Sequence, residues 1–113
     1  RGLGDVYKRQ VNNTIICGDK IELGYQVALG RDVVIRDNNG GHNIALEGYK
    51  NSHPVRIGAH VWLCSGCQIM PGCHIQDGAI IGANSVVSGK VKAHTLVTGN
   101  PVRVVDNDVF WNL

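Results

Sequence analysis

The sequence predicts an all-β fold, a parallel β-helix wound as a triangular prism, and three observations support this prediction. Every sixth residue from position 11 to 35, and again from 57 to 87, is almost always Val, Leu or Ile, although only 32 of the 113 residues are. A second track of small or apolar residues follows four positions after the first. Glycine directly follows several main-track residues. A six-residue period over most of a chain indicates a solenoid. The main track consists of Val11, Cys17, Leu23, Leu29, Ile35, Ile57, Leu63, Ile69, Ile75, Ile81 and Val87.

The period also predicts the register of the coils. A period of six residues does not fit an amphipathic helix, which repeats every 3.6 residues. It fits a prism in which each hexad forms one short strand and one corner, so that three hexads complete a coil of about 18 residues. Glycines beside the apolar positions relieve the tight corners. The predicted stacked pairs are Ile57 with Ile75, Leu63 with Ile81, and Ile69 with Val87.

One interval breaks the repeat. From Ile35 to Ile57 the spacing is 22 residues, which is not a multiple of six. Residues 37–54 are rich in Asn, Gly and His, and we expect them to form a loop extruded from one corner. Long loops without a pattern in a compact domain are usually functional or disordered.

Both ends also depart from the repeat. Residues 1–10 do not follow it, lack an initiator Met and look like translated adapter sequence, so we expect a non-native leader there. The β-helix domain is predicted to span residues 11–105, where a turn at Thr98-Gly99-Asn100-Pro101 ends the hexads. Residues 106–113 form a predicted C-terminal tail whose Phe110 and Trp111 would cover the end of the prism.

Composition limits the functional classes. The chain suits one domain with a thin core, because 43% of its residues are hydrophobic, and oligomerisation is expected. A net charge of +2 without a basic block argues against nucleic acid as a partner. A membrane partner is not expected either, since no apolar run approaches the roughly 20 residues of a span. Cys17, Cys67 and Cys73 fall on core tracks, where a free thiol acts as a small hydrophobe. We therefore expect a reducing, cytoplasmic setting.

Four short motifs resemble a known family. They are Ile57-Gly58-Ala59-His60-Val61-Trp62-Leu63, then Ile69-Met70-Pro71-Gly72, then Ile81-Gly82-Ala83-Asn84-Ser85-Val86-Val87, and finally Gly99-Asn100-Pro101. In this order they resemble the hexapeptide-repeat acyltransferases, and most of all the maltose, galactoside, capsule-sugar and xenobiotic O-acetyltransferases. The resemblance implies a left-handed parallel β-helix, a homotrimer, and acetyl-CoA bound in the groove between neighbouring prisms. It also implies acetyl transfer to a hydroxyl of a small, carbohydrate-like acceptor.

The resemblance further implies that a histidine on the interrupting loop is catalytic, which assigns the role to His42. Imidazole suits the task of taking a proton from an acceptor hydroxyl, because its pKa lies near about 6.5. Asp37 is expected to belong to the substrate site, orienting the loop or His42, with a turn-forming role as the alternative. His53 competes for the role of base, because serine acetyltransferases have a similar His-Pro before the hexads resume. The remaining alternative is that His42 is an exposed loop histidine without a catalytic function.

Further site residues follow from the resemblance. A backbone N–H around Ser65 is expected to stabilise the developing oxyanion. Trp62 would line the acceptor or acyl pocket, or else pack against a neighbouring chain. Small residues next to the C-terminal coils would let the pantetheine arm approach the backbone, although corner geometry alone would also explain them. Cations in the same region would meet the phosphates of CoA or form a solvated face. The expected cofactor-binding residues are Gly82, Ala83, Gly99, Asn100 and Arg103, with Lys90 and Lys92 as further candidate cations.

Two alternatives belong to other classes. A metal site is not expected, because no two histidines have the five-residue separation of γ-type carbonic anhydrases. Zinc bound by Cys64, Cys67 and the Cys73-His74 pair would require emptying the core, since two of these thiols face inward. The second alternative is a non-catalytic β-helix that serves as a trimerisation or interaction module, or an inactive fragment.

Overall fold

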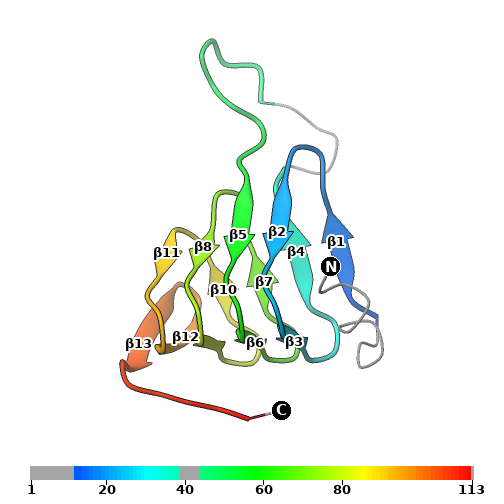
Figure 1. Ribbon diagram of the computed structural model, residues 1–113. Coiled ribbons are helices and arrows are strands. Elements are labelled where there is room, and N and C mark those ends of the chain that lie inside the picture. Colours follow the sequence, from blue (N-terminus) through cyan, green and yellow to red (C-terminus); the bar gives the residue numbers. More distant parts are fainter. Residues whose placement is uncertain (1–11, 39–43, 113) are drawn as a thin grey trace.

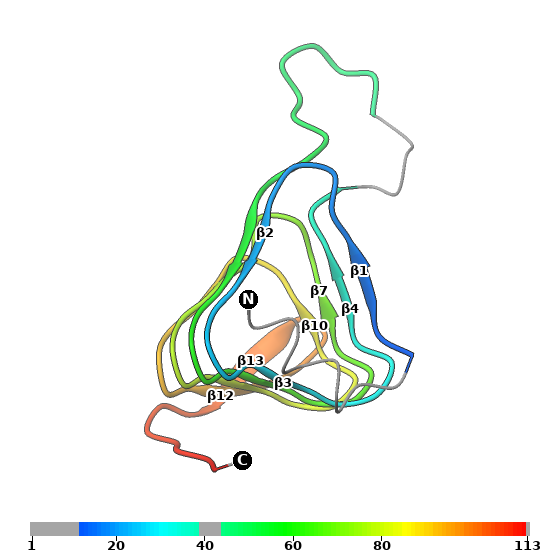
Figure 2. The same cartoon turned by 45° about the vertical axis from the view of Figure 1, so that its right-hand side comes forward.

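The computed structural model describes residues 12–38 and 44–112. These residues form thirteen strands and no helix, and the strands wind into a left-handed parallel β-helix of triangular cross-section (Figures 1 and 2). The predicted fold class is therefore confirmed. None of the described residues belongs to a helix that is long and apolar enough to cross a membrane.

Three sheets form the sides of the prism. Sheet I contains, in spatial order, β1 (Thr14–Ile16), β4 (Val34–Arg36), β7 (Gln68–Ile69) and β10 (Val86–Val87). Sheet II contains β11 (Lys90–Val91), β8 (His74–Ile75), β5 (Val55–Ile57) and β2 (Ile21–Leu23). Sheet III contains β13 (Val102–Asp106), β12 (Leu96–Gly99), β9 (Ile80–Ile81), β6 (Trp62–Leu63) and β3 (Ala28–Leu29). We name the three edges I/II, II/III and III/I after the sheets that meet there.

The later coils have the predicted register. Ile57 pairs with Ile75, Leu63 with Ile81, and Ile69 with Val87, each 18 residues apart. All six side chains are buried in one continuous apolar core. Burying a Leu or Ile side chain contributes roughly 1.5–3 kcal/mol, so this stack is the main source of stability in these coils.

The first coil has a different register. Ile15 pairs with Ile35, 20 residues along the chain, because Ile15 and Leu23 are eight residues apart, whereas the positions they align with in a later coil, Ile69 and Ile75, are six apart. The two additional residues lie around the corner at residues 17–20, which we call the long corner. The prediction that Cys17 occupies a core position is therefore wrong, and Cys17 is exposed. Ile15 takes the position equivalent to the main track, although it is only partly buried.

The other two predicted core thiols are confirmed. Cys67 and Cys73 are buried, and all four cysteines are free. Burial raises the pKa of Cys73 to about 12. Burial, with a smaller contribution from Cys64 and Cys73, also raises the pKa of Cys67 to about 12. These thiols are therefore packing groups rather than nucleophiles.

Two segments leave the prism. Between β4 and β5 the chain extends outward from edge I/II, and the bridge between Asn38 and Ser52 marks the base of this loop (Figure 1). At the other end, β13 returns antiparallel to β12. The prediction that Phe110 and Trp111 cover the end of the prism is wrong. Phe110 packs on His94 and is 73% exposed, while Trp111 packs on His60, so the two residues lie along edge II/III.

Candidate functional site

Most predicted donor-site residues lie along edge III/I. Ser65 is in the corner between β6 and β7, while Gly82 and Ala83 are in the corresponding corner one coil later. The coils are tied together there, since the Asn84 N–H donates to the carbonyl of Ser65 at 2.9 Å. Gly99 is the last residue of β12 and Asn100 follows it, at the end of the same edge. The structure therefore brings together residues that are up to 35 positions apart in the chain.

Backbone geometry and close packing explain Gly82 and Gly99, the two predicted cofactor-binding glycines of this edge. A Cβ atom on Gly82 would lie 2.7 Å from the Thr98 hydroxyl oxygen, so coil stacking itself requires glycine there. Gly99 has a φ of +111°, a backbone conformation that favours glycine, and its N–H donates to the Ser85 hydroxyl at 3.0 Å. The corner-geometry alternative therefore accounts for both residues, whether or not a ligand lies beside them.

Ser65 has a well-defined environment. Its hydroxyl accepts a hydrogen bond from the Arg31 N–H at 3.1 Å, and its backbone nitrogen packs closely against Gly30. Within the described part of the chain, no acceptor is assigned to the Ser65 N–H. An oxyanion site requires an N–H that is free to donate to the substrate.

Trp62 stands on the outer face of sheet III. Its neighbour Leu63 points inward and is completely buried, so Trp62 points outward by the alternation of a strand. It is 40% exposed. The row of residues that pair across the strands at this position is apolar: Ala28, Trp62, Ile80 and Leu96. Trp62 thus belongs to an apolar surface on the outer face of sheet III, between edges II/III and III/I.

Asp37, in contrast, is completely buried at edge I/II. One carboxylate oxygen accepts the Gly18 N–H at 2.8 Å, and the other accepts the N–H groups of Asp19 and Lys20 at 2.8 and 2.7 Å. Burial tends to raise the pKa of this carboxyl. The hydrogen bonds from Gly18, the Asn38 side chain, Asp19 and Lys20 outweigh that effect and lower the pKa to about 2.

This geometry corrects the substrate-binding role predicted for Asp37. A fully buried carboxylate with three backbone donors has no surface to offer a substrate, and it stabilises the long corner at residues 17–20 instead. The Asp37 carbonyl also accepts the N–H of His53 at 2.8 Å, so the same residue joins the two ends of the loop. Its role as an organiser of the loop, the other part of the prediction, agrees with these contacts.

The structure describes only one of the two candidate bases. His42 lies outside the described residues. His53 is exposed at the base of the loop, and its carbonyl accepts the Gly72 N–H at 3.1 Å. The loop base at edge I/II and the residues of edge III/I lie at opposite ends of the sheet I strands, and the described part of the loop extends away from the prism (Figure 2).

The predicted phosphate-binding cations do not form one cluster. Arg103 lies on β13, where it pairs with Thr98 and is exposed. Lys90 and Lys92 instead line a cavity of about 290 Å³ together with Val102, Val104 and Asn107. Only Arg103 is adjacent to the other predicted cofactor-binding residues.

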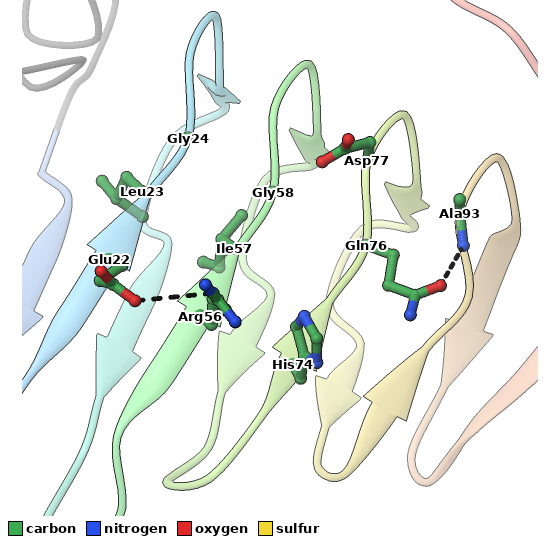
Figure 3. A pocket seen from close by; sticks show the side chains of 10 residues that line it. All are labelled: Glu22, Leu23, Gly24, Arg56, Ile57, Gly58, His74, Gln76, Asp77 and Ala93. Atoms are coloured by element: carbon green, nitrogen blue, oxygen red, sulfur yellow. Dashed lines mark hydrogen bonds and ion pairs between the residues drawn. The ribbon is translucent and has the colours of Figure 1, made fainter.

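A groove with a volume of about 600 Å³ lies on the outer face of sheet II (Figure 3). None of the predicted site residues lines it. Glu22 and Arg56 form an exposed ion pair of 3.6 Å across this groove. Two other polar side chains of the groove bind backbone N–H groups of neighbouring corners. The Gln76 side-chain oxygen accepts the Ala93 N–H, and the Asp77 carboxylate accepts the Ala59 N–H. Sequence reasoning missed this groove, although the outward row of charged residues along sheet II signals it.

Among residues 12–38 and 44–112, no group of three or more His, Cys, Asp and Glu side chains is arranged to hold a metal ion.

Comparisons with known proteins support a family assignment. Residues 54–89, which span two coils, match the family model described as bacterial transferase hexapeptide (six repeats). Residues 54–89 therefore carry the repeat of the hexapeptide transferases. A putative acetyltransferase from Staphylococcus aureus is 41% identical over 66 residues, covering 56% of this chain and 33% of that protein. The matched region is thus about a third of that relative.

Solved structures of hexapeptide-repeat transferases have the same architecture. A maltose O-acetyltransferase from Clostridium difficile is 28% identical and superimposes with a TM-score of 0.65, covering 87% of this chain and 66% of that chain. A galactoside acetyltransferase solved in complex with coenzyme A is 25% identical, with a TM-score of 0.63, covering 87% and 64%.

Proposed function

We propose that this chain is the β-helix part of an acetyl-CoA-dependent O-acetyltransferase that acts on a hydroxyl of a sugar or similar acceptor. The observation that supports this proposal best is that exposed Trp62 lies on the strand β6, which leads into the corner of edge III/I that contains Ser65. The similarity to a maltose O-acetyltransferase and to a galactoside acetyltransferase that binds coenzyme A supports the same chemistry. The free cysteines agree with a reducing compartment such as the cytoplasm.

The proposed reaction uses acetyl-CoA as a substrate. The acceptor oxygen attacks the thioester carbonyl while His42, as general base, takes the hydroxyl proton. The N–H of Ser65 stabilises the negative charge on the carbonyl oxygen of the tetrahedral intermediate. The C–S bond then breaks, and the thiolate of CoA leaves with the proton from the imidazolium. Gly82, Ala83, Gly99, Asn100 and Arg103 would flank the donor along edge III/I.

The homotrimer is part of this proposal. The loop that contains His42 starts and ends at edge I/II, whereas Trp62 and Ser65 lie on sheet III and edge III/I. A site that combines them therefore uses the loop of one copy and the donor edge of another. Such an arrangement requires at least two prisms side by side, which a trimer supplies.

The test is thiol release from acetyl-CoA with a panel of sugar acceptors, for the wild type and for His42→Ala. General-base catalysis contributes about 10²–10⁴-fold, so we expect a loss of at least about a hundredfold. His74→Ala serves as the control, because His74 lies in the groove on sheet II. Equal rates for wild type and His42→Ala would exclude His42, and a loss in His53→Ala would then identify the competing base.

The alternative is a non-catalytic β-helix module. A ligand that binds only the native state raises its stability, so CoA should increase the melting temperature of a transferase. The absence of both thiol release and stabilisation by CoA would favour the structural module.

A further inference from the structure

The C-terminal tail makes specific contacts with edge II/III. The Val109 N–H donates to the His94 carbonyl at 2.9 Å. The indole N–H of Trp111 donates to the His60 carbonyl at 2.9 Å, and the Trp111 carbonyl is 2.7 Å from Nε2 of the same histidine. Trp111 thus makes two hydrogen bonds to His60, one through its backbone and one through its side chain, and together they fix the position and orientation of the indole.

Ring packing strengthens this attachment. The Trp111 indole stacks on the His60 imidazole with centroids 4.0 Å apart and an interplanar angle of 12°. The preceding residue, Phe110, packs on His94 with centroids 4.7 Å apart. Consecutive tail residues therefore contact histidines of two different coils, and the tail runs along the prism toward the earlier coil.

The consequence is that Trp111 lies against Trp62. Their ring centroids are 5.7 Å apart, and the rings are tilted by 42°. These are the only two tryptophans in the chain. Trp62 belongs to the apolar row on the outer face of sheet III, and the docked tail contacts it from edge II/III. The two indoles thus form one continuous aromatic surface on the outer face of sheet III, next to edge II/III.

We propose that Trp111, together with Trp62, forms the wall of the acceptor pocket and selects acceptors that present an apolar ring face beside the reacting hydroxyl, as a pyranose does. This inference rests on the proposed acetyl transfer. Tryptophan offers a large, rigid contact surface at a low entropic cost, and its polar N–H is already satisfied here by His60. His60 is then a positioning residue that acts through Trp111.

The geometry is tested first, without any activity measurement. Two indoles that are close and tilted couple their electronic transitions, so the wild type should show an exciton couplet in far-ultraviolet circular dichroism. The couplet should disappear in both Trp111→Phe and Trp62→Phe, since each leaves one indole. It should persist in Phe110→Ala, the matched control, which removes the neighbouring aromatic ring of the same tail. A wild-type spectrum without the couplet would overturn the inference irrespective of activity.

Steady-state kinetics test the selectivity. Trp111→Ala should raise the acceptor KM by about three- to tenfold, the range expected for one aromatic pair, with kcat and the KM for acetyl-CoA within about twofold of wild type. Trp111→Phe should recover part of the loss, and Phe110→Ala should behave like wild type. An equal effect of Phe110→Ala, or an effect on the KM for acetyl-CoA alone, would overturn the role of Trp111 in acceptor binding. An intact couplet in a wild type without transferase activity would reject the proposed function, and the acceptor role with it, while confirming how the tail docks.

Discussion

Edges III/I and I/II are built on different principles, although they flank the same sheet. Along edge III/I the corners at residues 64–67 and 82–85 are equal in length, and small residues let successive coils stack closely. Along edge I/II the corners differ in length, and one of them is the long loop. There a buried charge, the Asp37 carboxylate, satisfies the backbone of the long corner. Where the repeat is regular, apolar stacking is sufficient; where it is interrupted, a polar anchor is needed.

The largest expected effect concerns the regular coils. Leu63 is completely buried and pairs with Ile81, whereas Leu23, a main-track residue of the first coil that pairs with Ile57, is only partly buried. Leu63→Ala should lower the free energy of unfolding by about 3–4 kcal/mol, and Leu23→Ala by roughly half as much. Urea denaturation measures both values. Similar losses at the two positions would mean that the first coil depends on apolar stacking as much as the later coils do.

Asp37→Asn is the corresponding test of the irregular edge. The amide of Asn would either point its NH₂ group at the backbone N–H donors or offer them a weaker acceptor than a carboxylate. We therefore expect the free energy of unfolding to fall by about 2–3 kcal/mol. Asp19→Asn is the matched control, because Asp19 is an exposed carboxylate in the same corner. If both substitutions changed the urea midpoint equally, the buried carboxylate would not be the anchor of this corner.

The Asp37 carboxylate also predicts a pH dependence. Its pKa in the folded protein is about 2, below the ordinary value of 3.8, so the folded state favours the ionised form. The resulting stabilisation is fully present above about pH 4 and is lost as the pH falls toward 2. The difference in unfolding free energy between wild type and Asp37→Asn should therefore shrink across this interval. A difference that stayed constant down to pH 2 would contradict the assigned pKa.

The smallest effect is expected on the outer face of sheet II. Glu22 forms exposed ion pairs with Lys20 at 3.7 Å and with Arg56 at 3.6 Å. Exposed pairs of this kind contribute little, so Glu22→Gln should change the free energy of unfolding by about 0.5 kcal/mol or less. The same replacement of a carboxylate by an amide is expected to cost several times more unfolding free energy at Asp37. The ratio of the two losses measures how much burial of the carboxylate contributes. A large loss at Glu22 would show that the groove on sheet II has a structural role of its own.

Sequence reasoning was most accurate where neighbouring coils repeat. The pairings of Ile57, Leu63 and Ile69 with residues 18 positions later follow from the period alone, because each hexad has the same length. The same reasoning placed Cys17 in the core and was wrong, since two additional residues in one corner shift the register without changing the apolar pattern visibly. The arrangement of Ser65, Gly82 and Gly99 on one edge was also predictable from the period. The position of His42 stays a prediction.

Contacts between distant, unpatterned residues could not be predicted. His60 and Trp111 are 51 residues apart, and nothing in the local sequence of either residue indicates the other. Asp37 looked like a residue for the substrate because it precedes the loop histidine, but only the folded chain places three backbone N–H groups around its carboxylate.

The sequence by itself determined the β-helix and its register in the later coils, because these features depend on a period that every coil repeats. Tertiary structure alone decided how the long corner is stabilised and where the tail docks. Both depend on hydrogen-bond and ring geometry between segments that meet only after the coils have stacked. Periodic burial is encoded locally, whereas the satisfaction of single polar groups and the packing of single rings are properties of the folded chain.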